Sequence, residues 1–205
     1  MLIIGLTGGI ATGKSTVSKL LTDRGYEVID TDQIAHGLLV PESDLLQEVV
    51  ETFGSTVLNP DNSLNRKALG DVIFSDEVAR AKLDAIMHPN ILEEVKRQLE
   101  QSSASLLFID VPLLFEAGFD QLTHLNVVVY ANPEEQLKRL MKRDNISVVN
   151  ALAAHKKVDA QLPIDEKVRL ADFVVDNNGL LTDLESNLDQ VLEKVVGAVN
   201  HEAKC

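Results

Sequence analysis

The chain has 205 residues, of which 45% are hydrophobic and 25% are charged, and its formal net charge is −13. A chain of this length buries one sizeable core, and it has no apolar run long enough for a membrane span or a secretory signal. The acidic balance disfavours nucleic-acid binding, and the only cysteine is Cys205. We expect a cytoplasmic protein that acts on small molecules, with no nucleic-acid or membrane partner. Its oligomeric state is left open, with a monomer favoured.

Residues 8–16, called the glycine loop below, read Gly-Gly-Ile-Ala-Thr-Gly-Lys-Ser-Thr and match G-x-x-x-x-G-K-[ST], a loop that wraps nucleotide phosphates. An apolar run over 1–6 predicts a strand before it, and 17–21 predict a helix after it, which ends at Arg24-Gly25. The alternative is a glycine-rich turn that carries Lys-Ser by chance. Nucleotide contacts are predicted for Gly8, Gly9, Ala11, Thr12, Gly13, Lys14, Ser15 and Thr16.

Each residue type in the glycine loop has a physical reason. Gly8 and Gly13 are expected to adopt backbone angles closed to other residues, so that the chain curls around an anion. The loop N–H groups and the helix N-terminus then attract phosphate. Lys14 is expected on the β- and γ-phosphates, and the Ser15 hydroxyl on Mg²⁺.

Further apolar runs predict four more strands, and helical patterns separate them. The strands are expected over 27–30, 105–110, 125–130 and 172–176. They lack strict alternation, which is typical of parallel strands buried on both faces. The pattern predicts an α/β fold with a parallel sheet and right-handed crossovers.

Two helix starts and one long insertion complete the predicted elements. Asn132-Pro133 predicts a capped helix start, and Thr182-x-x-Glu185 predicts a capping box for the last helix. About sixty residues over 38–101 separate two strands and carry several helical patterns. This segment is either a helical insertion on the ligand-binding side of the sheet or additional packing against the core.

Acidic residues end two of the predicted strands. Asp30 and Asp32 are two apart on an expected extended segment, so both carboxylates should face the phosphate site. One of them is a candidate general base, or a Mg²⁺ contact through water. The alternative is that Asp32 only caps the next helix. Asp110 is a candidate second Mg²⁺ contact.

Two further segments leave alternatives open. The residues Val111 to Glu116 are too apolar for a solvated turn, so they form either the floor of a substrate pocket or part of the core. His88-Pro89 interrupts the insertion, and a lone histidine is more often structural than catalytic. The five histidines and the cysteine show no metal-ligand spacing.

Basic residues gather in one segment, 138–169, which has a local balance of +4. They are Lys138, Arg139, Lys142, Arg143, Lys156, Lys157, Lys167 and Arg169. The segment is either a solvated helical face or one that folds over phosphates, and the glycine loop upstream favours the second.

The motifs occur in a specific order along residues 3–200. The glycine loop, Asp30-Thr31-Asp32, His88-Pro89 and Asp110 to Glu116 are followed by two more patterns. These are Gln136-x-x-Arg139-Leu140-x-x-Arg143 and Asp172-x-x-x-Asp176-Asn177-Asn178-Gly179. Together they resemble the dephospho-CoA kinase family.

The resemblance implies ATP-dependent phosphorylation, with Mg²⁺, of the ribose 3′-hydroxyl of dephospho-CoA, the last step of coenzyme A biosynthesis. It also implies a P-loop three-layer sandwich with a five-stranded parallel sheet in a single domain over 3–201. The core would comprise 1–37, 102–143 and 166–205, with a helical acceptor-binding insertion over 38–101 and a helical lid over 144–165.

The resemblance also assigns roles to individual residues. It implies that Asp32 is the general base and that Lys14 and Arg139 are catalytic. Arg139 and Arg143 are expected on ATP. The acceptor is expected to contact His88, Pro112, Leu113, Leu114 and Phe115.

The chain departs from the family pattern at two places. Thr31 stands where the family has alanine and should point away from the site. Lys157-Val158-Asp159-Ala160-Gln161 stands where the family commonly has Arg-Ile-x-x-Gln, and a lysine cannot make the bidentate phosphate contact of an arginine. The rival hypotheses are another small-molecule or nucleoside-monophosphate kinase, and a nucleotide-dependent switch without an acceptor.

Overall fold

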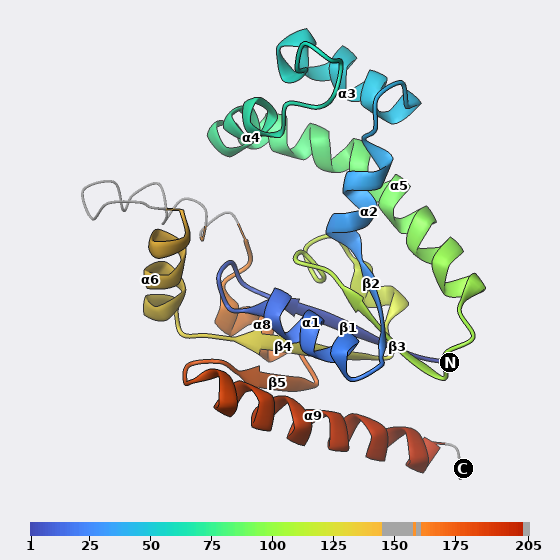
Figure 1. Ribbon diagram of the computed structural model, residues 1–205, viewed down its shortest axis with the longest axis vertical. Coiled ribbons are helices and arrows are strands. Elements are labelled where there is room, and N and C mark those ends of the chain that lie inside the picture. The colour runs from blue at the N-terminus through green and yellow to red at the C-terminus, as the bar shows by residue number, and fades with distance from the viewer. Residues whose placement is uncertain (145–157, 159–160, 203–205) are drawn as a thin grey trace. The chain divides into compact units, whose positions relative to one another are not determined.

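The computed structural model describes residues 1–144, 158 and 161–202, without the side chains of residue 74 and residues 198–202. Five strands form one sheet in the order β2-β3-β1-β4-β5 (Figure 1). They are β1 (Leu2–Gly8), β2 (Glu27–Asp30), β3 (Leu106–Asp110), β4 (Leu125–Tyr130) and β5 (Phe173–Asp176). The pairs β1–β3, β1–β4 and β4–β5 are parallel. The predicted α/β class with a five-stranded sheet is confirmed.

Helices separate and follow the strands as expected for this class. In the described residues they are α1 (Lys14–Asp23), α2 (Thr31–Leu38), α3 (Asp44–Phe53), α4 (Arg66–Ser75), α5 (Glu77–Gln101), α6 (Pro133–Arg143), α8 (Ile164–Leu170) and α9 (Leu181–Glu202). Two short 3₁₀ turns span Ser55–Val57 and Phe119–Leu122.

The chain divides into two compact units, Met1–Ile29 with Ser103–Cys205, and Asp30–Ser102. The second unit contains the whole helical insertion predicted over 38–101, and it also includes α2. Of the predicted lid, 144–165, residues 145–157 and 159–160 lie outside the described residues. The lid therefore stays a prediction.

The core of the first unit lies between the sheet and the helices α1 and α9. Ile4 and Leu6 of β1 pack in one buried cluster with Val17 and Leu21 of α1 and with an apolar stripe of α9. That stripe is Leu184, Leu188, Val191, Leu192 and Val195. The alternate positions of β1 face the other side of the sheet, where a Cβ on Gly5 would lie 2.8 Å from Leu114 Cδ2. Successive side chains of a strand point to opposite faces, so the sheet is covered on both.

Local sequence explains how α1 ends and how α6 begins. Tyr26 N–H donates to Leu21 O and Gly25 N–H to Thr22 O, which with Gly25 at φ 85° forms the glycine-terminated end of α1. Asn132 Oδ1 accepts from Glu135 N–H at 2.9 Å at the start of α6. Both predicted boundaries are confirmed.

The predicted capping box of the last helix is wrong. Thr182 lies inside α9, which begins at Leu181. Instead, the Asp183 carboxylate accepts from Leu180 N–H at 2.9 Å. In a capping box the third helical residue accepts from the N–H of the cap residue, and the cap side chain accepts from the helix in return. Only the first of these bonds forms here, because the cap residue, Leu180, has no polar side chain.

The second unit is a helical assembly around α5, which α2, α3 and α4 all contact. Pro89 was expected to interrupt this region, but it lies inside the continuous α5. A proline has no N–H to donate to the carbonyl four residues earlier. Asn90 Nδ2 donates to Ile86 O nearby. The tertiary contacts along α5 outweigh a local helix-breaking signal.

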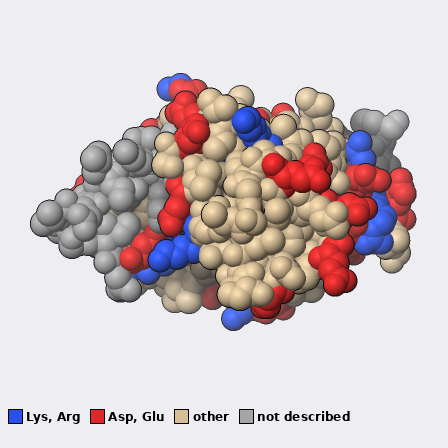
Figure 2. All heavy atoms as spheres, turned by 90° about the horizontal axis from the view of Figure 1, so that it is seen from above, with Lys and Arg blue, Asp and Glu red and all other residues tan. Residues whose placement is uncertain are grey.

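The surface is acidic in character, in line with the net charge. Figure 2 shows acidic side chains spread widely over one face, with basic side chains in small separate groups, mostly next to acidic ones. In the part of the chain that the structure describes, no helix is long and apolar enough to cross a membrane.

Candidate active site at the carboxyl edge of the sheet

The glycine loop follows β1 and leads directly into α1. Gly13 has a φ of 94°, in the left-handed region that favours glycine, and a Cβ there would overlap Asn177 Nδ2. The second left-handed residue is Ala11, with a φ of 61°, so the prediction of special backbone angles is wrong for Gly8. Gly8 is required for a different reason, because its Cβ would lie 2.6 Å from Thr12 Oγ1 and 2.9 Å from Val129 O.

Side chains outside the glycine loop hold it in place. Asn177 Nδ2 donates to Thr12 O at 2.7 Å, and Gln161 Oε1 accepts from Ile10 N–H at 2.8 Å. Within the loop, Thr12 Oγ1 donates to Gly9 O at 2.9 Å, and the Thr12 side chain is fully buried. Thr12 therefore shapes the loop through its side chain, and its backbone N–H and C=O are hydrogen-bonded to Gly9 O and Asn177 Nδ2.

Lys14 and Asp110 form an ion pair beside the glycine loop. Lys14 Nζ donates to Asp110 Oδ1 at 2.5 Å, and only 15% and 4% of the two side chains are exposed. The parallel register of β1 and β3 pairs Leu6 with Asp110, which brings the end of β3 level with the loop. A cation and a carboxylate thus lie together beside the glycine loop.

The oxygen ligands near Lys14 suit Mg²⁺. Ser15 is exposed on the first turn of α1, and Asp110 supplies a carboxylate. Mg²⁺ prefers oxygen ligands and is usually bound by one or two protein groups together with phosphates and water. Among the described residues no group of three or more His, Cys, Asp or Glu could hold a metal by itself. These donors therefore fit a metal that arrives with a nucleotide.

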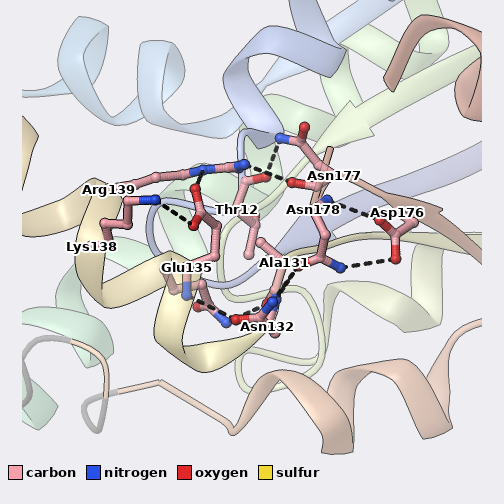
Figure 3. A network of polar contacts seen from close by, with 10 residues as sticks. Thr12, Ala131, Asn132, Glu135, Lys138, Arg139, Asp176, Asn177 and Asn178 are labelled. Atoms are coloured by element: carbon pink, nitrogen blue, oxygen red, sulfur yellow. Dashed lines mark hydrogen bonds and ion pairs between the residues drawn. The ribbon is translucent and has the colours of Figure 1, made fainter. Parts of the chain in front are cut away.

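Arg139 is held in a fixed orientation on α6 (Figure 3). Its Nε donates to Glu135 Oε1 at 2.9 Å, and its Nη2 donates to Asn177 O at 2.8 Å. The hydrogen bond from Arg139 is the main cause that lowers the pKa of the Glu135 carboxyl. Arg143 instead pairs with its neighbour Asp144 at 2.8 Å, and 59% of its side chain is exposed.

The described basic residues of the segment 138–169 differ in their surroundings. Lys167 is fully buried, with Nζ 2.9 Å from Glu116 Oε1 and 2.7 Å from Pro112 O. Burial lowers the pKa of Lys167, and the pair with Glu116 opposes this shift. Arg169 pairs with Glu166 on the surface. Lys156 and Lys157 lie outside the described residues, and Arg139 shares Asn177 as a hydrogen-bond partner with the glycine loop.

The segment Val111–Glu116 belongs partly to the core and partly to the site edge. Leu114 is fully buried, so its predicted contact with the acceptor is wrong and the core alternative holds for this residue. Pro112, Leu113 and Phe115 remain partly exposed. The Pro112 carbonyl accepts from Thr7 Oγ1 at 3.1 Å as well as from Lys167. Glu116 also accepts from Leu162 N–H at 2.9 Å.

Asp32 lies in the second unit, in the first turn of α2. Asp30 ends β2 and is the N-cap of this helix, accepting from Asp32 N–H at 2.8 Å and from Gln33 N–H at 3.1 Å. The expected shared face of Asp30 and Asp32 is therefore wrong, because the chain is no longer extended at Thr31. The alternative that Asp32 is the cap is also wrong. Asp32 is exposed and Thr31 is buried.

His88 also belongs to the second unit, on α5. Its Nε2 lies 3.6 Å from Asp84 Oδ1, one helical turn earlier, and 31% of its side chain is exposed. This exposure leaves its predicted role in acceptor binding as a prediction.

Sequence reasoning assigned no role to the residues that brace the site. Gln136 is buried, donates to Ala131 O at 2.8 Å, and would lie 2.6 Å from a Cβ on Gly9. Asn177 is the second such residue. Both belong to motifs that carried the family resemblance, and for Asn177 the signal was a polar residue directly after an apolar strand.

The fold and the site together define a P-loop kinase. A glycine loop lies between the first strand and a helix, with a lysine at the helix start and an arginine from a later helix beside it. A shikimate kinase from Acinetobacter baumannii has the same fold, with a TM-score of 0.53, 17% identity, and coverage of 97% of this chain and 94% of that one.

Comparisons with known proteins then identify the family. The family model for dephospho-CoA kinase matches residues 2–183. Relatives named dephospho-CoA kinase include one from Carboxydothermus hydrogenoformans, 43% identical over 93% of this chain and 91% of its own length. Another, from Anaeromyxobacter dehalogenans, is 44% identical over 96% of this chain and 93% of its own length. A solved dephospho-CoA kinase from Campylobacter jejuni is 30% identical, with a TM-score of 0.67 and coverage of 94% of this chain and 96% of that one.

The chain belongs to the dephospho-CoA kinase family. It is accordingly an ATP-dependent phosphotransferase that acts on dephospho-CoA in the last step of coenzyme A biosynthesis.

Proposed function

We propose that Lys14 and Arg139 act on the ATP phosphates and that Asp32 acts on the ribose 3′-hydroxyl of dephospho-CoA. The reaction joins the 3′-oxygen to the γ-phosphorus, breaks the bond from that phosphorus to the β,γ-bridging oxygen, and transfers the hydroxyl proton to the Asp32 carboxylate. Phosphoryl transfer depends mainly on positioning and on charge stabilisation.

The observation that carries this proposal is the glycine loop with Lys14 at the head of α1. Its N–H groups and the positive end of the helix attract phosphate oxygens. The Lys14 ammonium already lies beside a carboxylate at 2.5 Å, so a phosphate, which is also an anion, can replace that partner. Arg139 is pre-oriented by Glu135 and Asn177 and adds a second fixed positive charge.

Asp32 is proposed as the base because it is an exposed carboxylate just after a strand of the sheet. Asp30 fixes the turn that carries it, which limits the reorganisation needed for proton transfer. His88 and the exposed parts of Pro112, Leu113 and Phe115 are proposed to contact the acceptor. Arg143 is proposed to reach ATP only after it leaves Asp144.

Ser15 and Asp110 are proposed to hold Mg²⁺ with the nucleotide. When bound, this ion offsets the negative charge of the phosphates. We also propose a cytoplasmic monomer, which the acidic composition and the position of the single cysteine support.

The test is acceptor-dependent formation of ADP. The protein is incubated with Mg-ATP and, in separate reactions, dephospho-CoA, AMP or no acceptor, and ADP and the product mass are measured. ADP should form only with dephospho-CoA, with a product that carries one added phosphate on the 3′-oxygen. Lys14→Ala should lower turnover at least about a hundredfold, as for removal of one transition-state charge contact. ADP formed equally well without acceptor would contradict the proposal.

A further inference from the structure

The turn that follows β5 contacts both the glycine loop and the helix that carries Arg139. Asn177 is the central residue of this turn, and only 8% of it is exposed. Its backbone N–H donates to Tyr130 O at 2.7 Å, which fixes the residue to the end of β4. Its side chain and its carbonyl then point to two different parts of the site (Figure 3).

The side chain of Asn177 sets the orientation of one peptide of the glycine loop. Asn177 Nδ2 donates to Thr12 O at 2.7 Å, and both groups are buried. In a trans peptide the C=O and the next N–H point in opposite directions. Holding the Thr12 carbonyl toward Asn177 therefore turns the Gly13 N–H away from Asn177. Gly13 itself must lack a Cβ for this approach, because a Cβ would overlap Asn177 Nδ2.

The carbonyl of Asn177 orients Arg139. It accepts from Arg139 Nη2 at 2.8 Å, while Glu135 Oε1 accepts from Arg139 Nε at 2.9 Å. The next residue supports the same helix, since Asn178 Oδ1 accepts from both N–H and Nδ2 of Asn132, each at 2.8 Å. Asn132 caps α6, and Asp176 in turn accepts from Asn178. One turn thus fixes the start of α6 and the guanidinium that α6 carries.

We propose that Asn177 is a positioning residue of the kinase: its side-chain amide directs the Gly13 N–H of the glycine loop at the ATP phosphates, and its carbonyl holds Arg139 in register with that loop. This inference rests on the proposed roles of the glycine loop and of Arg139. Asn177 touches no reacting atom. It restricts the movement of the Gly13 N–H and of the Arg139 guanidinium, so that both donors are already oriented toward the phosphates when ATP binds.

The test replaces the amide donor and keeps its shape. In Asn177→Asp an ionised carboxylate oxygen faces the Thr12 carbonyl and repels it. The KM and the equilibrium Kd for ATP should each rise about tenfold or more, the cost of losing a buried hydrogen bond. The KM for dephospho-CoA should change less than about twofold, since the proposed acceptor contacts involve other residues.

A matched control separates positioning from a general loss of structure. Asn187 Nδ2 donates to Asp176 O at 2.9 Å, so it makes the same kind of bond to the same turn without touching the glycine loop. Asn187→Asp should leave the Kd and KM for ATP unchanged. If Asn177→Asp does not fold, Asn177→Ala serves the same comparison, because it removes the donor without adding a repulsive charge.

A second measurement uses pH. In the Asn177→Asp variant the introduced carboxyl group, once protonated, can donate to Thr12 O as the amide does, and burial favours the neutral form of a carboxyl. The ratio of variant to wild-type kcat/KM for ATP should therefore increase as the assay pH falls from about 8 to about 5.5. Because protonation of a buried carboxyl group would also restore folding stability, thermal unfolding of the variant is measured at both pH values, and the increase should persist where the variant is fully folded at both.

The outcomes distinguish this inference from the proposed function. If the wild-type protein forms no ADP with dephospho-CoA, the proposed function fails. If the wild type is active and Asn177→Asp binds ATP as tightly as the wild type, the positioning role is overturned. Equal losses for Asn177→Asp and Asn187→Asp would overturn it as well.

Discussion

Lys14 Nζ lies 2.5 Å from Asp110 Oδ1, so the lysine of the glycine loop has a carboxylate partner within the protein itself. The pairing follows from the sheet, because β1 and β3 run in parallel with Leu6 opposite Asp110. Both side chains are largely buried, and a buried charge is stabilised only while it is paired. The pair therefore keeps the ammonium fixed beside the loop before any phosphate binds.

Asp110→Asn should separate two roles of this carboxylate, the ion pair with Lys14 and the proposed support of Mg²⁺. The neutral amide leaves Lys14 without a charged partner, and we expect the free energy of unfolding to fall by about 2–3 kcal/mol. If Asp110 also supports Mg²⁺, the Mg²⁺ concentration for half-maximal turnover should rise at least about tenfold. Thermal unfolding and a Mg²⁺ titration of turnover measure the two effects. An unchanged Mg²⁺ requirement would limit Asp110 to neutralising Lys14.

Asp32→Asn should keep ATP affinity and lose most turnover, because the amide cannot accept the hydroxyl proton. A loss of about 10²–10⁴ in kcat is expected for removal of a general base. The matched control is Asp30→Asn, since asparagine also caps helices and keeps the acceptor for the first turn of α2. Turnover of both variants is compared with their equilibrium Kd for ATP. Near-normal turnover of Asp32→Asn would remove Asp32 as the base.

Glu116→Gln should destabilise the first unit through Lys167. Lys167 is fully buried, so loss of the Glu116 charge leaves an ammonium held only by the Pro112 carbonyl and a neutral amide. We expect a decrease of about 3 kcal/mol in the free energy of unfolding. The control is Glu166→Gln, whose partner Arg169 is 71% exposed, with an expected change within about 0.5 kcal/mol. Denaturant unfolding measures both, and equal effects would contradict the assigned burial.

Gly13→Ala should impair the glycine loop, whereas Gly197→Ala should stabilise the protein. At Gly13 the new methyl group would overlap Asn177 Nδ2 and the backbone φ of 94° disfavours alanine, so we expect ATP binding to weaken at least about tenfold. At Gly197, inside α9, a Cβ meets nothing within 4 Å, and alanine should add about 0.5–1 kcal/mol of stability. ATP titrations and thermal unfolding of the two variants test the contrast. Tight ATP binding by Gly13→Ala would show that the loop tolerates a side chain at this position.

The sequence by itself determined the local features. Apolar runs of four to six residues between helical patterns predicted the five strands, and Asn132-Pro133 and Arg24-Gly25 predicted helix boundaries, because these signals act through the backbone within a few residues. The glycine loop was recognised in the same way, since its chemistry is encoded in nine consecutive residues. The family followed from the order of the motifs along the chain.

Only the tertiary structure decided which side chains meet. The sequence treated Lys167 as a member of a basic segment, but packing buries it against Glu116. Pro89 was expected to interrupt the insertion, but α5 continues through Pro89. The contacts of α5 with α2, α3 and α4 maintain the helix. Asn177 lies 165 residues from Thr12, and no local pattern encodes a hydrogen bond across that separation. Such contacts depend on strand order and register, which arise from the burial of the whole core.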